Sequence, residues 1–517
     1  MGEARACSCE GCPEARWLED PNGLCLVHSP LNGKDDGTAK QVWARARAKA
    51  QERDADFRGW HFPVDSDKEG FRSVPFRGDA SFAGARFEGG ARFDDASFEG
   101  TADFTGARFE GDASFRGAEF QGGAQFGRVS VRGSAGFEGA RFQGGTWFVD
   151  AAIEGDARFK GASFQGFAWF MRAGVRGSAW FDDASFAANA WFDRASFQGL
   201  AVFTGAGFHG GAQFDGAAFR SDARFEGASF QDEALFSGAS FQGSARFERA
   251  SFLCDARFER AGIQGNAWFE GASIHGDARF EGANIEGDAS FADASIHGNA
   301  RFEGVSFQGD GWFERASFRG KADYRGVQWR EGKEIHFDLP SRPLPFGRRK
   351  PFSLPEHGET AYRLAKQSAT ARGDYTGAAE YYYAERCATE HWRRKQFGWK
   401  PWCPSFWRSL FELVFARWVF GYGQRPSRVL LLGLVVIVLW AFRAYGCAGI
   451  TPGLAPEMGY EPTSAECLHF SVSTFMTLGY GDFVPKPQFR IWADAEAFLG
   501  ASFLAVFIVG LTRKYAR

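Results

Sequence analysis

A short loop near the C-terminal end of the chain has a composition suited to holding a cation with backbone oxygens. Gly479 and Gly481 stand at alternate positions of the segment 477–482. Because glycine has no Cβ, both positions can take backbone angles that other residues avoid, and successive carbonyl groups can then face one axis. The hydroxyl of Thr477 can add a further oxygen at one end. Such an array of oxygens can take the place of water around a dehydrated cation.

A second group of residues whose side chains could do chemistry lies near the N-terminus. Cys7, Cys9, Cys12, Cys25 and His28 read C-x-C-x2-C-x12-C-x2-H, and thiolates with an imidazole at such spacings suit tetrahedral zinc. Small knots of similar appearance use C-x4-C followed by C-x2-H. We therefore predict Cys7, Cys12, Cys25 and His28 as the ligands of a structural Zn²⁺, with Cys9 as the substitute. The alternative is that these are surface thiols of a disordered leader.

Two apolar segments flank the glycine-bearing loop, and both are long enough to cross a membrane. The first, 429–450, is broken only by Arg443 and spans about 33 Å as a helix. The second is 491–512, and Glu496 within it is expected to face protein or water. The stretch 464–482 between them is too short and too polar to span, which predicts a re-entrant helix and loop.

Charge and the N-terminal sequence set the expected topology. Basic residues precede the first apolar segment and follow the second, which predicts that both chain ends lie in the cytoplasm. The N-terminus has no apolar signal core, in agreement with this orientation. We therefore expect a multi-pass protein of the plasma membrane.

A further apolar stretch, 404–423, precedes the first spanning segment. Arg408, Glu412 and Arg417 interrupt its apolar face. We predict a helix that lies in the membrane interface. The alternative, a third spanning helix, would place these three charges in hydrocarbon.

The order of these elements resembles the pore module of potassium channels with two membrane helices. The loop reads Thr477, Leu478, Gly479, Tyr480, Gly481 and Asp482, and it is similar to the T-V-G-Y-G selectivity filter of that family. The resemblance covers 428–517 and implies a K⁺-selective pore with K⁺ bound by backbone carbonyls. Since one chain supplies one filter strand of four, it also implies a C4 homotetramer.

The same resemblance implies roles for single residues around the loop. The pore helix should run from about Ser464 to Met476, with Tyr480 packed behind the filter and Asp482 at its outer mouth. Met476 stands where the family usually has threonine, and Ser473 stands where some members have glutamate. Gly500 is either a gating hinge or a site of close helix packing.

This module also contains one candidate covalent cross-link. Cys447 and Cys467 both fall on the predicted outer side of the membrane, where a disulfide could join them.

A strict repeat occupies the middle of the chain, which contains 66 glycines and 58 phenylalanines among 517 residues. Phenylalanine recurs every 11 residues from Phe71 to Phe313, and a second register from Phe76 to Phe318 holds phenylalanine or a β-branched residue. Two glycines in each unit would each cost about 1 kcal/mol inside a helix, which argues against a helical coiled coil. Short extended segments with glycine at the corners predict a β-solenoid with a continuous phenylalanine core.

The A-x-F-x-x units, with an added residue in every second unit, resemble the Phe-rich variety of the pentapeptide-repeat family. The resemblance implies a right-handed quadrilateral β-helix in which four pentapeptides form one square coil. Two 11-residue units for each coil give about 11 to 12 coils over 71–325 and a rod roughly 55 Å long. Outward positions carry charges of both signs, so we expect a mixed, solvated surface.

The remaining segments complete the predicted domain organisation. In chain order it comprises a zinc-knot-like head (1–35), a helical or irregular linker (36–70), the β-helix (71–330), a proline-rich basic linker (331–356), a cytoplasmic helical hairpin (357–397), the interfacial helix (404–423) and the pore domain (428–517, with membrane helices 428–450 and 491–512). Proline excludes strand and helix interiors from the linker. Gly373 and Asp374 mark the turn of the hairpin.

Composition narrows the function classes. A formal net charge of −3 does not fit a basic nucleic-acid binder, so no nucleic-acid partner is expected. Histidine and carboxylate residues form no recognisable nucleophile or open metal site, and we expect no enzyme. Without a voltage-sensing arginine ladder or a nucleotide-binding motif, the β-helix is the expected sensor or docking module for an unidentified cytoplasmic protein or ligand.

Two alternatives to a conducting channel stay open at this point. One is a membrane-anchored pentapeptide-repeat scaffold with a dead pore. The other is mimicry of duplex DNA toward topoisomerases, which some pentapeptide-repeat proteins show. The acidic excess of the repeat segment is mild, and its acidic residues are interspersed with basic ones. This second alternative therefore has the least support.

Overall fold

The computed structural model describes residues 24–29, 36–65, 68–330, 333, 335–337, 358–371, 373–397, 426–445, 449–454 and 460–515. The chain forms two compact units, Met1–Asp338 with Arg349–Glu356 and Leu339–Arg348 with His357–Arg517. Several predicted features lie outside the described residues: Cys7, Cys9, Cys12, Cys447, the interfacial segment 404–423 and most of the linker 331–356.

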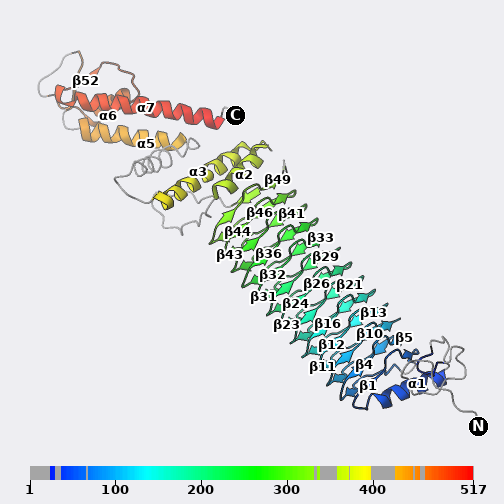
Figure 1. The fold of residues 1–517 in the computed structure, drawn as a ribbon. Coiled ribbons are helices and arrows are strands. Elements are labelled where there is room, and N and C mark those ends of the chain that lie inside the picture. Colours follow the sequence, from blue (N-terminus) through cyan, green and yellow to red (C-terminus); the bar gives the residue numbers. More distant parts are fainter. Residues whose placement is uncertain are drawn as a thin grey trace, which may run out of the picture. The chain divides into compact units, whose positions relative to one another are not determined.

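The first unit is a four-sided parallel β-helix, in which two-residue strands stack coil upon coil (Figure 1). One coil consists of β26 (Ala201–Val202), β27 (Gly207–Phe208), β28 (Ala212–Gln213) and β29 (Ala218–Phe219). The next strand, β30 (Ala223–Arg224), pairs in parallel with β26, and Ala223 lies beside Ala201. Each coil therefore contains 22 residues, which confirms the prediction of two 11-residue units in a coil.

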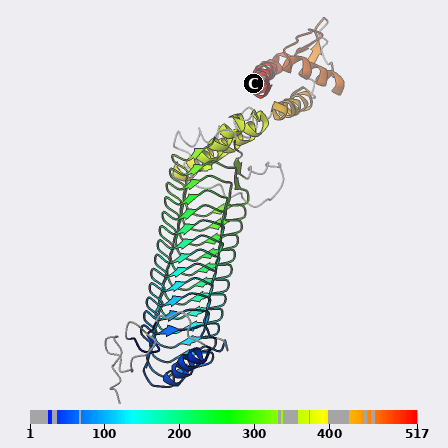
Figure 2. The same ribbon diagram turned by 90° about the vertical axis from the view of Figure 1, so that its right-hand side faces the viewer.

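The coils extend beyond the strictly periodic sequence. The four sheets contain 13, 12, 12 and 13 strands, from β1 (Ala55–Asp56) and β2 (His61–Phe62) to β50 (Ile335–Phe337). The first coil forms ahead of Phe71 because Phe57 and Phe62 already fill inward positions, and both are fully buried. Figure 2 shows the resulting straight stack of coils.

Columns of stacked phenylalanine rings form the core of the β-helix. The ring of Phe203 lies 4.8 Å from that of Phe181 and 4.8 Å from that of Phe225, and the rings are nearly parallel. It also meets Phe192 and Phe214 edge to face at 5.5 and 5.4 Å. Aromatic pairs in these arrangements add about 0.5–1.5 kcal/mol each beyond the area that they bury. The repeat therefore stabilises every coil through its neighbours.

The corners of the coils explain the glycine content. A Cβ at Gly177 would lie 2.4 Å from the carbonyl carbon of Gly155 in the preceding coil, so the stacked backbones come too close for a side chain. Carboxylates satisfy other corner amides, as where Asp112 accepts a hydrogen bond of 2.7 Å from the backbone amide of Ser134. Both devices keep the coil spacing constant.

A helix covers the first coil of the β-helix. In α1 (Asp36–Lys49), the ring of Trp43 is buried against Phe62 and Phe71, at 5.1 and 5.5 Å between ring centres. Its indole nitrogen donates a hydrogen bond of 3.1 Å to the carbonyl of Pro63. Terminal coils of a solenoid need such a cap because their core would otherwise face water.

The second unit contains a helical hairpin. Helices α2 (Gly358–Ala371) and α3 (Tyr375–Phe397) are joined by a turn in which Gly373 has a φ of 77°. The carboxylate of Asp374 accepts a hydrogen bond of 2.9 Å from the amide of Gly377 and caps α3. Glu385 on α3 pairs with Arg363 and Lys366 on α2 at 3.1 and 2.7 Å.

The same unit contains the elements around the glycine-bearing loop. In chain order they are α5 (Pro426–Leu439), the π-helical turn η3 (Trp440–Tyr445), β51 (Ile450–Pro452), α6 (Ser464–Phe475), β52 (Phe483–Pro485), the short 3-10 helix η4 (Pro487–Phe489) and α7 (Arg490–Tyr515). Strands β51 and β52 pair antiparallel.

The second apolar segment forms a helix of membrane-spanning length. Within the described part of the chain, one helix is long and apolar enough to cross a membrane, over Pro487–Val509. The first apolar segment is α-helical only to Leu439 and continues as η3 to Tyr445, so it is shorter as a helix than 428–450. Among the described residues, most of the exposed large hydrophobic side chains lie between 430 and 509.

Replacing one ring of the core tests the stacked columns. We expect Phe203→Ala to lower the free energy of unfolding of the β-helix by about 3–5 kcal/mol, since it removes a fully buried ring and leaves a cavity. Urea denaturation of the full-length chain, followed by far-ultraviolet circular dichroism, measures the change. The control is Gln198→Ala at an exposed position, with an expected change within about 0.5 kcal/mol. Equal changes for the two variants would contradict the stacked core.

Candidate functional site

Helix α6 leads directly into the glycine-bearing loop. Its N-terminus is fixed by a capping box, in which the hydroxyl of Thr463 accepts a hydrogen bond from the amide of Glu466 and the carboxylate of Glu466 accepts one from the amide of Thr463. The helix ends at Phe475, and its C-cap residue Met476 directly precedes the loop. The negative end of the helix dipole therefore lies beside the start of the loop, where it favours a cation.

The backbone of the loop alternates in handedness. Thr477, Gly479 and Gly481 have φ values of 55°, 58° and 77°, whereas Leu478 and Tyr480 between them have no positive φ. The two glycines take these angles without strain, but the β-branched Thr477 does not. Strained backbone of this kind costs about 1–3 kcal/mol and gathers at functional sites.

The carbonyl oxygens of the loop have no protein partner in the described part of the chain. No described residue donates a hydrogen bond to the carbonyls of 477–481, although the amides of Thr477 and Leu478 bond back to the end of α6. The residues 477–481 are exposed in the single chain, so these carbonyls are open to water or to a cation, and such an array is suited to a cation. The side chains of Leu478 and Tyr480 are 54% and 67% exposed in the single chain.

The far end of the loop is held by Asp482. One carboxylate oxygen of Asp482 lies 2.8 Å from Nε2 of His469 on α6. The other accepts a hydrogen bond of 3.1 Å from the amide of Phe483. The backbone carbonyl of Asp482 accepts a hydrogen bond of 2.8 Å from the amide of Gly453. A Cβ at Gly453 would lie 2.1 Å from the carbonyl oxygen of Gly481, so glycine is required for this approach.

A buried carboxylate joins the helices behind the loop. The side chain of Glu496 on α7 is fully buried and accepts a hydrogen bond of 2.7 Å from the hydroxyl of Tyr445. It accepts a second hydrogen bond from the hydroxyl of Ser471 on α6, which also lies 2.9 Å from the carbonyl of Ile437 on α5. A buried carboxylate is stable only with such partners. Sequence patterns indicated that Glu496 faces protein or water but gave no partner for it.

Gly500 lies where α7 crosses the end of α6. A Cβ at this position would lie 1.8 Å from the carbonyl oxygen of Phe475. Close packing therefore explains the glycine, and a role as gating hinge stays a prediction. An apolar cavity of about 270 Å³ adjoins this crossing, and its lining includes Met476, Thr477, Leu504 and Phe507.

Two of the four predicted zinc ligands lie within the described residues, and they are adjacent. Sγ of the buried Cys25 lies 3.0 Å from Nδ1 of His28. The other ring nitrogen of His28 lies 3.2 Å from the carbonyl oxygen of Arg58. A metal-bound histidine usually holds its second nitrogen in this way, so the donors fit zinc. Among the described residues no group of three potential ligands occurs, and the site stays a proposal.

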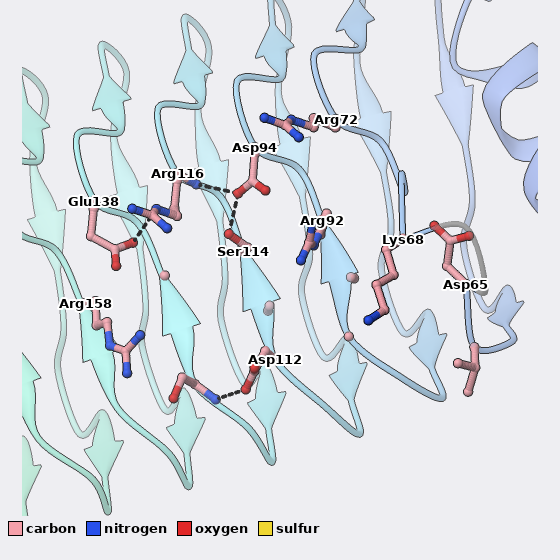
Figure 3. Close-up of a pocket in the computed structure, with 16 residues that line it drawn as sticks. Asp65, Lys68, Arg72, Arg92, Asp94, Asp112, Ser114, Arg116, Glu138 and Arg158 are labelled. Carbon is pink, nitrogen blue, oxygen red and sulfur yellow. Dashed lines mark hydrogen bonds and ion pairs between the residues drawn. The ribbon is translucent and has the colours of Figure 1, made fainter.

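A shallow hollow of about 550 Å³ opens on one face of the β-helix near its N-terminal end (Figure 3). It exists because Ser114 and Gly136 occupy two successive outward positions of a sheet, between Arg92 and Arg158. Its rim carries both charges, and Arg116 pairs with Glu138 at 3.8 Å. This is the mixed surface that the sequence predicts, with neither sign dominant.

Comparison with known families finds a match in two parts of the chain. A model described as pentapeptide repeats (9 copies) matches 71–119, 115–163, 192–240, 203–251, 236–284 and 269–317. A model described as ion channel matches 430–517. No curated protein and no solved structure matches the chain. The two matches confirm the pair of resemblances drawn from the sequence.

The crossing of α6 and α7 can be tested by adding one methyl group. Gly500→Ala is expected to destabilise the second unit by about 1–3 kcal/mol, because the new Cβ meets backbone that cannot move aside. Thermal unfolding of the detergent-solubilised protein measures the loss. Ala501→Ser, at the next and exposed position, serves as the control and should unfold close to the unchanged protein. If Gly500→Ala behaves like the control, the close crossing is wrong.

Elemental analysis of the purified full-length chain tests the zinc proposal. We expect about one zinc per chain, and its loss in Cys25→Ser because a hydroxyl is a poor zinc ligand. Cys254→Ser is the matched control, since this thiol lies on the β-helix and contacts the carbonyl of Gln231. Protein without zinc, or zinc retained in Cys25→Ser, would show that the head is not a zinc site.

Proposed function

The chain is a fusion of a pentapeptide-repeat β-helix with a C-terminal ion-channel domain, and from this premise we propose that it is a potassium-selective channel of the plasma membrane. The proposal makes 477–482 the selectivity filter, α5 with η3 and α7 the two membrane helices, and α6 the pore helix. Both termini then lie in the cytoplasm, together with the β-helix.

The unpartnered carbonyl array of 477–481 is the observation that carries the proposal. Five consecutive carbonyl groups without a protein donor are exposed in the single chain, and in an assembled filter a dehydrated K⁺ would take the place of the water around them. The alternating angles at Thr477, Gly479 and Gly481 allow these groups to share one direction. Na⁺ and K⁺ differ in the number of such oxygens that coordinate them and in the distance from the ion to those oxygens. This difference is the physical basis of selection.

A ring of four chains completes the filter in this proposal. One chain supplies one array of carbonyls, and its Leu478 and Tyr480 side chains stay about half or more exposed. In a C4 tetramer, neighbouring chains cover such side chains and their arrays surround a common axis. The exposed apolar side chains of α5 and α7 then divide between neighbouring chains and lipid.

The β-helix and the hairpin are proposed as the sensor or docking module. The repeat has a rigid core, a surface of mixed charge and a covalent connection to the pore domain. Such a module can bias the pore only if its partner binds the open and closed states with different affinity. A scaffold that is anchored in the membrane without conduction is the alternative, and it predicts no ion flux.

Substitutions of the glycines in the loop distinguish a conducting channel from a scaffold without ion flux. Gly479→Ala and Gly481→Ala should abolish barium-blocked K⁺ flux into proteoliposomes, since alanine disfavours the left-handed angles that align the carbonyls. Gly238→Ala is the matched control: it also has a positive φ of 66° with open space around it, but it lies on the β-helix. We expect this control to keep its flux.

Two outcomes would reject the channel. The first is the absence of K⁺ flux from the unchanged protein when it is correctly assembled, as the scaffold alternative predicts. The second is flux that persists in both loop variants, because the carbonyl array would then not be the conducting path.

A further inference from the structure

The hollow near the N-terminal end of the β-helix has the size of a small-molecule site. Its volume is about 550 Å³, and sites for small molecules measure about 300–1,000 Å³. Figure 3 shows Lys68, Arg72 and Arg92 toward one end of the hollow, and Glu138 with Arg158 at the other end. Charges of both signs line it, but the acidic and the basic side chains differ in how they are engaged.

The acidic side chains of the hollow have partners within the β-helix. Asp94 accepts hydrogen bonds from the hydroxyl of Ser114 and from the backbone amide of Arg116. Asp112 accepts one of 2.7 Å from a backbone amide of the next coil. Glu138 lies 3.8 Å from the guanidinium of Arg116. These donors offset the negative charge of the carboxylates before any ligand binds.

Three basic side chains of the hollow differ from these carboxylates. Lys68, Arg72 and Arg92 are exposed, and they form neither an ion pair nor a side-chain hydrogen bond with any described residue. Arg158, in contrast, pairs with Asp156 at 2.9 Å. A guanidinium without a carboxylate partner keeps its planar array of donors, which matches the oxygens of a phosphate group. One end of the hollow is therefore suited to an anion.

The loop 68–74 holds two of these three cations beside the edge strand β6 (Ala91–Arg92). The amide of Phe71 donates a hydrogen bond of 2.7 Å to the carbonyl of Arg92, and the ring of Phe71 is fully buried in the core. The carboxylate of Asp65 accepts a hydrogen bond of 2.6 Å from the amide of Gly70. Cations on a backbone that is already ordered lose less freedom when a ligand binds.

The remaining lining of the hollow limits the chemistry of the ligand. No aromatic side chain is among the described residues that line it, so a nucleobase would find no ring to stack on. From this arrangement we propose that the hollow binds a small polyanion with two or more phosphate groups, through Lys68, Arg72 and Arg92. The inference goes beyond the proposed function, because binding here does not require ion conduction. It supplies a ligand class for the module that we propose as the sensor.

Isothermal titration calorimetry of the full-length protein with inorganic triphosphate tests the site. We expect saturable binding at a single site in each chain, which weakens at high salt because exposed charges are screened. Arg72→Gln and Arg92→Gln should each weaken binding about fivefold, since each removes one partly exposed ion pair with the ligand. Arg220→Gln, an exposed arginine of the β-helix that also lacks an ion pair among the described residues, is the matched control and should bind as the unchanged protein does.

Filling the hollow tests its shape separately from its charge. Ser114 lies beside Arg92 in the sheet, and outward positions of the same sheet carry Trp180 and Trp268, so the β-helix accommodates tryptophan in this column. We expect Ser114→Trp to lose binding although every cation is kept. Ser114→Ala removes the same hydroxyl but leaves the hollow open, and it should keep binding. Far-ultraviolet circular dichroism checks that both variants are folded.

The same phosphate chemistry occurs in soluble metabolites and in lipid headgroups. Titrations with inositol trisphosphate and with the corresponding phosphoinositide on short acyl chains distinguish these two sources. Equal affinity for the two compounds indicates a soluble ligand, whereas tighter binding of the lipid assigns the site to a headgroup. Either result supports a phosphate site.

Several outcomes would overturn the site without touching the proposed channel. They are the absence of saturable binding with all three phosphate compounds, equal affinity in Arg72→Gln, Arg92→Gln and Arg220→Gln, binding retained in Ser114→Trp, and an equal loss in Ser114→Ala and Ser114→Trp. Calorimetry needs no ion flux, so a protein that binds triphosphate but conducts no K⁺ would reject the proposed channel and leave the phosphate site in place.

Discussion

Unpartnered carbonyl groups on a strained backbone are the constraint around which the C-terminal domain is organised. The left-handed angle at Thr477 costs energy, and the carbonyls of 477–481 gain no hydrogen bond from the described residues to offset it. Such a loop keeps its strained conformation only if several contacts with its surroundings hold it in place. The cap of α6, the contact of Asp482 with His469 and the hydrogen bonds of Glu496 each fix one neighbouring element. In the proposed channel, a cation is the missing partner of these carbonyls.

The two domains are stabilised in different ways. Every coil of the β-helix repeats similar ring contacts at close to 5 Å. The stability of the β-helix is therefore approximately a sum of similar interactions between adjacent coils, and no single coil contributes much more than the others. The channel domain instead depends on contacts that occur once, such as Gly500 against Phe475 and Tyr445 against Glu496. Substitutions should therefore be tolerated more evenly in the repeat than around the loop.

Sequence periodicity accounts for much of the fold, and its limits have physical causes. The 11-residue spacing of phenylalanine led to the 22-residue coil, but it gave no sign of the first coil, whose Phe57 and Phe62 stand outside the period. Gly479 and Gly481 pointed to left-handed backbone because glycine permits it. A β-branched residue normally avoids left-handed backbone angles, so the positive φ of Thr477 could not be expected from its residue type. The partners of Glu496 are 51 and 25 residues away, a distance over which sequence patterns carry no signal.

The reversal potential of the purified protein under K⁺ on one side and Na⁺ on the other tests the central claim most directly. If carbonyls of the loop replace the hydration shell of K⁺, the potential will lie near the equilibrium potential of K⁺ and shift by about 58 mV for a tenfold change in its concentration. A reversal potential near zero under the same gradients would show a pore that does not distinguish the two ions. That result would contradict the account of the carbonyl array.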